Sequence, residues 1–131
     1  METPKILTVR QPWAWAIIHG GKDIENRTWP VDYRGPVIIH AGRAFDDEGF
    51  DLVHKLCDEV PDHDLFWSSR GKIIGRVDIV DCVKDYSSLW AETGDRVWNW
   101  VLANPVPARH SLTVRGQLGL RTVGDGWERA F

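Results

Sequence analysis

The chain has 131 residues, of which 43% are hydrophobic and 27% are charged, proportions that exclude a disordered or fibrous protein. Its length suits a single domain over residues 1–131, and its formal net charge of −3 argues against a protein that coats duplex DNA with a broad basic face. No apolar run reaches the roughly 18–20 residues of a membrane span, and the opening segment METPKILTVR has no apolar signal core, so we expect a cytoplasmic protein without a membrane partner.

The first elements expected along the chain are a short strand over residues 6–10 and a helix over residues 13–18. Pro12 suits the first helical turn, where its missing N–H leaves no hydrogen bond unmade. Gly20 and Gly21 follow, and glycine supplies the left-handed conformation at which helices often end. We expect this short apolar helix to depend on packing, because an isolated helix of this length is unstable in water.

Two strands and a second helix are expected next. Residues 24–29 and 36–40 have strand character and are separated by a turn-rich segment. Residues 46–58 fit an amphipathic helix, with an aspartate at its start to cap the free backbone N–H groups. Pro61 marks the end of this helical pattern.

The second half of the chain favours strands. Residues 72–83 are the longest strand candidate, and residues 97–103 again alternate between two faces. The two prolines within residues 104–107 predict a rigid loop. Residues 112–122 are then expected to form a closing hairpin that turns at Gly116.

Taken together, these elements predict an α+β protein. Six or seven short strands would form a small, mainly antiparallel sheet with two or three flanking helices. A closed β-barrel is the economical arrangement, because closure removes sheet edges that so short a chain has little material to cover.

Charge is unevenly distributed along the chain. Residues 46–64 contain eight acidic residues against one lysine, whereas the remainder is mildly basic. The stretch from Arg96 to Gly124 contains four arginines and no acidic residue. The simplest explanation of the acidic segment is a solvated helix face. The distribution as a whole permits a local cationic cleft on an acidic protein.

Tryptophan is unusually frequent, with eight residues against two tyrosines and four phenylalanines. A buried indole N–H needs a hydrogen-bond partner, so a small core accommodates only a few tryptophans easily. The sequence therefore leaves two interpretations open: an indole-rich core, or indoles that line a cleft or stacking surface.

The segment from Ile24 to Trp29 places chemically active side chains on one strand face. Strand alternation puts Glu25, Arg27 and Trp29 together and Asn26 on the other face. On a barrel interior the glutamate and arginine would form a partly buried ion pair. On an exposed strand the same pair would contribute little.

Several motifs together resemble the ASCH domain, a family similar to PUA-like folds. They are Q-P-W-A, then G-G-K-x-x-E-N-R-T-W, Y-R-G-P-V-x-I-H-A-G and G-x-x-x-G-R-V-D-I-V-D-C, followed by W-x-W-V-L-A-N-P-V-P and R-G-Q-x-G-L. The resemblance covers nearly the whole chain. It implies a small PUA-like β-barrel that binds RNA or another nucleic acid, with a nucleotide-sized ligand in a cleft beside the first helix.

Carried over position by position, the resemblance implies a cleft with eight lining residues. These are Gln11, Trp13, Lys22, Glu25, Arg27, Trp29, Arg34 and His40. Such a cleft would favour a single strand or a modified or flipped base, because a duplex hides the base edges that it would read.

The expected roles follow from side-chain chemistry. Lys22 and Arg34 adjoin glycines and suit phosphates. Trp13 or Trp29 would stack on a base, while Gln11 and Glu25 would contact a base edge. Each residue also has a structural interpretation, as a core indole, an internal ion pair, a solvated cation or, for His40, a histidine held by its neighbours.

The resemblance also implies a hydrolase alternative, because some relatives are amidohydrolases on acylated nucleosides and others are ribonucleases. The amidohydrolase type uses a lysine, a threonine three residues later and a glutamate from elsewhere. Here Glu25 stands three residues after Lys22, so the hydroxyl nucleophile is missing, and Thr28 falls on the opposite strand face. If the protein is an enzyme, Lys22 and Glu25 are its candidate catalytic residues.

No metal or other cofactor is expected. Five scattered histidines lack the spacing of a metal site, and two cysteines do not make a thiolate zinc site or a disulfide framework. A third class of function is a protein-interaction adaptor, in which the acidic residues 46–64 dock a partner and Trp67 or Trp90 acts as an anchor.

Overall fold

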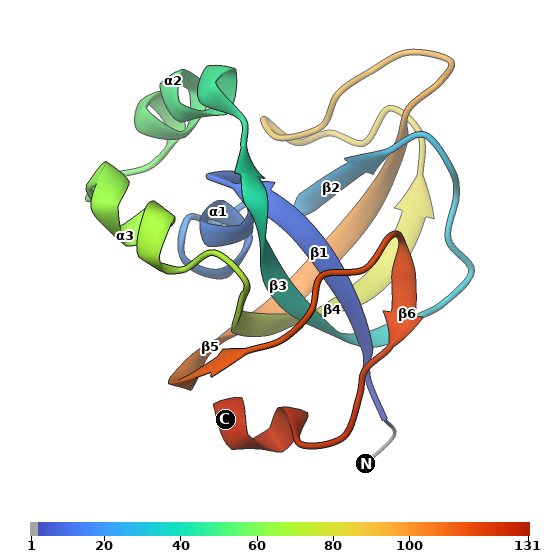
Figure 1. The fold of residues 1–131 in the computed structure, drawn as a ribbon. Helices are drawn as coiled ribbons and strands as arrows, with labels where there is room; N and C mark the ends of the chain where they lie inside the picture. Colours follow the sequence, from blue (N-terminus) through green and yellow to red (C-terminus); the bar gives the residue numbers. More distant parts are fainter. Residues whose placement is uncertain (1–2) are drawn as a thin grey trace.

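The computed structural model describes residues 3–131 and has the expected α+β composition, shown in Figure 1. In chain order its elements are β1 (Lys5–Gln11), α1 (Trp13–His19), β2 (Ile24–Arg27), β3 (Gly35–Phe45), α2 (Asp47–Leu56), α3 (His63–Ser68), β4 (Lys72–Val83), β5 (Trp98–Thr113), β6 (Leu120–Thr122) and the 3-10 helix η1 (Trp127–Ala130).

The strands form one sheet in the order β2-β5-β4-β3-β1-β6. β1 and β3 run parallel, and all other neighbouring strands in this sheet are antiparallel, so the prediction of a mainly antiparallel sheet is confirmed. Hydrogen bonds within residues 3–131 do not close the sheet into the expected barrel, because the short strands β2 and β6 form its two edges. The helix α1 packs against β1, β3, β4 and β5.

The prediction of a rigid loop over residues 104–107 is wrong, because these residues continue β5 alongside β4. Both Pro105 and Pro107 lie in the strand, and Pro107 is paired with Gly75. β2 pairs with β5 as far as Val101, and the Leu102 N–H still donates to the Asp23 carbonyl, but no strand within residues 3–131 pairs with this edge of β5 further along. A proline is tolerated on such an edge because no neighbouring strand needs its missing N–H.

The expected hairpin over residues 112–122 is also wrong. Leu112 pairs with Ile73 of β4, whereas β6 pairs with β1, where Leu120 lies opposite Leu7. The connecting segment passes across β1 and β3 before it reaches β6 (Figure 1). Local turn signals predict that residues 118–122 pair back onto residues 112–114. Instead residues 120–122 reach the open edge of β1, which is far away in the sequence, and pair there as β6.

The helices agree with the sequence where they are long enough to show a pattern. α2 begins after Asp46, whose side chain accepts a hydrogen bond from the Gly49 N–H as an N-cap. α1 ends at the predicted glycines, and Gly21 has a φ of +74°. The helices α3 and η1, of six and four residues, are too short to give a periodic signal. None of the helices within residues 3–131 has the length and apolar character needed to cross a membrane.

Two apolar clusters hold the sheet in place. In β1, Leu7 packs into a cluster with α1 and Trp100, while Ile6 packs into a second cluster with η1, as strand alternation requires. The indole of Trp100 is fully buried and donates to the Trp29 carbonyl at 3.0 Å. Trp67, by contrast, is 52% exposed, so the tryptophans are not all core residues.

Candidate functional site

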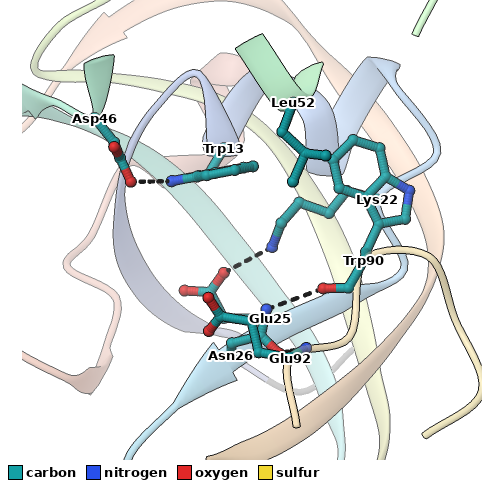
Figure 2. A pocket seen from close by; sticks show the side chains of 8 residues that line it. All are labelled: Trp13, Lys22, Glu25, Asn26, Asp46, Leu52, Trp90 and Glu92. Carbon is teal, nitrogen blue, oxygen red and sulfur yellow. Dashed lines mark hydrogen bonds and ion pairs between the residues drawn. The ribbon is translucent and has the colours of Figure 1, made fainter. Parts of the chain in front are cut away.

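A pocket of about 220 Å³ opens beside α1, at the edge strand β2 and the start of α2, and is closed on one side by the β4–β5 loop (residues 84–97). Figure 2 shows its walls, with two indoles on either side of a lysine and carboxylates around it. The lining residues are Trp13, Lys22, Glu25, Asn26, Asp46, Leu52, Trp90 and Glu92.

Trp13 forms one wall and is held by the cap of α2. Its indole Nε1 donates to Asp46 Oδ2 at 2.9 Å. The other carboxylate oxygen of Asp46 accepts from the Gly49 N–H at 3.2 Å. One aspartate therefore starts α2 and fixes the orientation of the indole.

The floor contains a buried charge cluster. Lys22 is 5% exposed and Glu25 is 6% exposed, and their charged groups lie 3.3 Å apart. Arg27 Nε contacts the other oxygen of Glu25 at 2.8 Å, and its guanidinium also donates to the Thr8 carbonyl. The Lys22 ammonium further donates to the Ile24 carbonyl. Each of the two cations is thus paired with the same carboxylate inside the protein.

The third wall comes from the β4–β5 loop, which two asparagines hold in place. Asn26 donates to the Trp90 carbonyl at 3.0 Å and accepts from the Glu92 N–H at 3.0 Å. Asn99, which is fully buried, donates to both Asn26 and the Glu92 carbonyl and accepts from the Tyr86 N–H. These bonds bring Trp90 and Glu92 to the pocket from a distant part of the sequence.

The pocket is not the cationic cleft that the sequence predicts. Its charged side chains are one ammonium and the carboxylates of Glu25, Asp46 and Glu92. Arg34 lies outside it, because its guanidinium donates to the carbonyls of Val31 and Tyr33 in its own turn. The carboxylate of Glu92 forms no hydrogen bond or ion pair with the part of the chain that the structure describes.

The structure brings Trp13, Lys22 and Glu25 together in this pocket, and Arg27 adjoins it through Glu25. It does not bring in the other four expected residues. Gln11 is buried, where its amide bonds the Trp15 N–H and the Ser69 hydroxyl.

Trp29, which is 40% exposed, packs edge-on against Trp100 rather than into the pocket. His40 is buried elsewhere, between the Thr8 hydroxyl and the Val114 carbonyl. Strand alternation and turn position did not reveal these neighbours, which come from distant parts of the chain.

Five lining residues were not among the expected site residues. Asp46 and Leu52 have sequence signals, but these are the signals of a helix cap and an apolar helix face. Asn26 falls on the other face of β2 by alternation, yet it reaches the pocket because β2 is an edge strand. Trp90 stands out as a tryptophan, whereas no local pattern points to Glu92.

The side chains that line the pocket can stack on a planar ring and form hydrogen bonds, and Lys22 with Glu25 forms its ionisable pair. Among the lining residues there is no serine, threonine or cysteine to act as a nucleophile, and Thr28 is exposed outside the pocket. Within residues 3–131 there is no group of three or more His, Cys, Asp or Glu side chains placed to hold a metal ion.

The fold and the pocket are those of a small α+β domain with an indole-lined site beside its first helix. The family model of the ASCH domain matches residues 7–108, from β1 into β5. The chain therefore belongs to the ASCH domain family, a PUA-like family generally associated with RNA binding. A search of curated proteins finds no matching relative.

Proposed function

We propose that this protein binds RNA and that the pocket between Trp13 and Trp90 receives one unpaired nucleobase. The observation that carries the proposal is the arrangement of two indoles around a buried lysine–glutamate pair in an ASCH domain. Stacking on an aromatic side chain contributes about 1–3 kcal/mol per base.

The size of the pocket supports a single base. Its volume of about 220 Å³ is below that of sites for drug-sized ligands, which typically enclose about 300–1,000 Å³. A base that enters such a pocket must leave any duplex in which it is paired, at a cost of a few kcal/mol. A single strand avoids this cost, so single-stranded RNA is the favoured ligand.

The charges of the pocket favour a base with an exocyclic amino group. Carboxylates accept hydrogen bonds but do not donate them when ionised. The free carboxylate of Glu92 therefore suits the amino group of cytosine or adenine, and disfavours the carbonyl oxygen found at the same place in uracil.

Fluorescence anisotropy with short labelled RNAs tests this function. We expect an oligocytidine to bind more tightly than an oligouridine of equal length, and a duplex to bind more weakly than either. Trp90→Ala should weaken oligocytidine binding about tenfold, since it removes one stacking surface. Trp67→Ala is the matched control, because Trp67 is exposed on α3 outside the pocket. Equal binding by wild type and Trp90→Ala would contradict the proposal.

The alternative functions give different results with the same preparations. A hydrolase would release the free acid from an acylated cytidine and would lose this activity in Lys22→Met. An adaptor, anchored to a protein partner by Trp67 or Trp90, would show no oligocytidine binding that Trp90→Ala weakens. We expect neither turnover nor a dependence of RNA binding on Trp67.

A further inference from the structure

A second and larger cavity, of about 590 Å³, opens where β1, β3 and the turn before β4 face the segment that follows β5. It shares no lining residue with the pocket at Trp13. We call it the Arg43/Arg115 cavity, after the two arginines that line it. The segment that covers it is the one that crosses β1 and β3 on the way to β6 (Figure 1).

The Arg43/Arg115 cavity has an uncompensated positive charge. No aspartate or glutamate is among its lining residues. Both arginines are exposed, and neither side chain forms a hydrogen bond or an ion pair within residues 3–131. Arg115 comes from the acid-free stretch between Arg96 and Gly124. The guanidinium groups therefore keep all their donors available, and their planar fork matches the geometry of a phosphate.

Two of the glycines that line this cavity, Gly71 and Gly116, bring backbone without a side chain to its wall. Gly71 has a φ of +77°, and a Cβ there would lie 3.9 Å from Arg43 Nη2, so this guanidinium lies close to bare backbone. At Gly116 a Cβ would lie 3.3 Å from His40 Cε1. The backbone of Arg115 and Gly116 makes no hydrogen bond with the described residues, and free backbone N–H groups are suited to an oxyanion.

A chain of hydrogen bonds through the buried His40 holds the covering segment in position. The Gln117 N–H donates to the Thr8 hydroxyl at 3.2 Å, and this oxygen lies 3.0 Å from His40 Nδ1. On the other side of the ring, His40 Nε2 lies 3.0 Å from the Val114 carbonyl. The carbonyl only accepts, so Nε2 carries a proton in this pair. Arg115 is therefore anchored on both sides, at Val114 and Gln117, rather than placed on a free loop.

We propose that the Arg43/Arg115 cavity is a phosphate-binding site for a nucleotide, either free or within an RNA strand. The two arginines bind the phosphate oxygens, and the backbone N–H groups of Arg115 and Gly116, unpaired within residues 3–131, supply further donors. The site is independent of the base pocket, because each uses its own residues and recognises a different part of a nucleotide.

Amide-resolved NMR titration tests the site directly. The probes are inorganic phosphate, uridine 5′-monophosphate and a short oligouridine without a terminal phosphate. Uracil lacks the amino group that the base pocket favours, so these probes report mainly on phosphate. We expect the amide signals of Gly71 and Gly116 to shift on titration. Arg43→Gln with Arg115→Gln should weaken the response at least about tenfold, since charge-assisted hydrogen bonds are lost.

The matched control replaces two other exposed arginines, as Arg109→Gln with Arg121→Gln, which changes the net charge equally outside the cavity. This control should keep the wild-type response. Two results together identify the RNA backbone as the ligand. The amide signals shift with the oligouridine, and the Arg43/Arg115 double variant binds it with a weaker salt dependence. The slope of log affinity against log salt concentration should decrease in magnitude by about 0.7 for each phosphate contact that is lost. Shifts with the mononucleotide or phosphate alone identify a free phosphate.

The absence of shifts at both glycines with every probe, or equal weakening in the two double variants, would overturn the proposal. The spectrum of each variant also shows whether it is folded. Failure of the base pocket would instead appear as unchanged oligocytidine binding in Trp90→Ala, so the two proposals fail separately.

Discussion

The indole of Trp13 and the carboxylate of Asp46 are joined by a hydrogen bond of 2.9 Å that links the wall of the pocket to the start of α2. The same carboxylate caps the helix through the Gly49 N–H. Helix stability and pocket shape thus depend on one side chain, although 33 residues separate the two partners in the sequence.

Asp46→Ala should lower both stability and oligocytidine affinity. Loss of an N-cap costs about 1 kcal/mol, and loss of the bond to the indole adds about 1 kcal/mol. Urea unfolding should therefore show a decrease of roughly 2 kcal/mol in the free energy of unfolding. Asp51→Ala, on an exposed position of α2, is the control and should remain near wild type. A variant at Asp46 as stable as this control would show that the cap contributes nothing.

Gly49→Ala should displace Trp13. A Cβ at this position would lie 2.6 Å from Trp13 Cζ2, a contact that the rigid indole relieves only by moving. Overpacking of this kind typically costs about 1–3 kcal/mol. Urea unfolding and oligocytidine binding measure the two consequences. Gly124→Ala is the matched control, since its Cβ would meet nothing within 4 Å. A Gly49→Ala protein with wild-type stability and affinity would contradict the close contact.

Glu25→Gln should be more destabilising than Lys22→Met. The carboxylate of Glu25 is shared by Lys22 and Arg27, so its neutralisation leaves two cations without their partner. Removing one partner of a buried pair costs about 3–5 kcal/mol, and the partial exposure of Arg27 places our expectation at the lower end. In Lys22→Met the ion pair between Glu25 and Arg27 is kept. Equilibrium urea unfolding gives both values, and the reverse order would disprove the shared role of Glu25.

Cys57 should react slowly with alkylating reagents. Burial, and secondly the negative charge of Asp58, raise the pKa of the Cys57 thiol. A raised pKa lowers the fraction of thiolate, which is the reactive form. We expect slower iodoacetamide labelling of Cys57 in the folded protein than in urea at the same pH, and faster labelling in Asp58→Asn. Peptide mass spectrometry separates Cys57 from Cys82, and equal rates in folded and unfolded protein would refute the expectation.

Local sequence was sufficient for the parts of the fold that local chemistry decides. The cap at Asp46, the left-handed Gly21 and the long strand β4 all follow from side-chain type and spacing. The path of the chain after Ala103 does not, because it depends on which strand has a free edge. β5 extends past its prolines and β6 joins β1 for that reason.

The site divides in the same way. Trp13, Lys22 and Glu25 are close in sequence and meet in the pocket, as their motif predicts. Trp90 and Glu92 come from a loop whose position is set by hydrogen bonds across more than 60 residues, and no local pattern encodes such bonds. The excess of carboxylates in the pocket comes from Asp46 at the start of α2 and from Glu92 in this loop, two residues that the sequence did not place beside Lys22 and Glu25.

Asn99→Ala should release the β4–β5 loop and open the pocket. The Asn99 amide is fully buried and bonds Asn26, the Glu92 carbonyl and the Tyr86 N–H. Its removal leaves several polar groups without partners, each costing about 1–3 kcal/mol when buried. Hydrogen exchange should become faster at the Tyr86 and Glu92 amides, and oligocytidine binding should weaken because Trp90 is no longer held. Thr93→Ala, at an exposed position of the same loop, should change neither property. Unchanged exchange in Asn99→Ala would mean that contacts other than these amide bonds hold the loop.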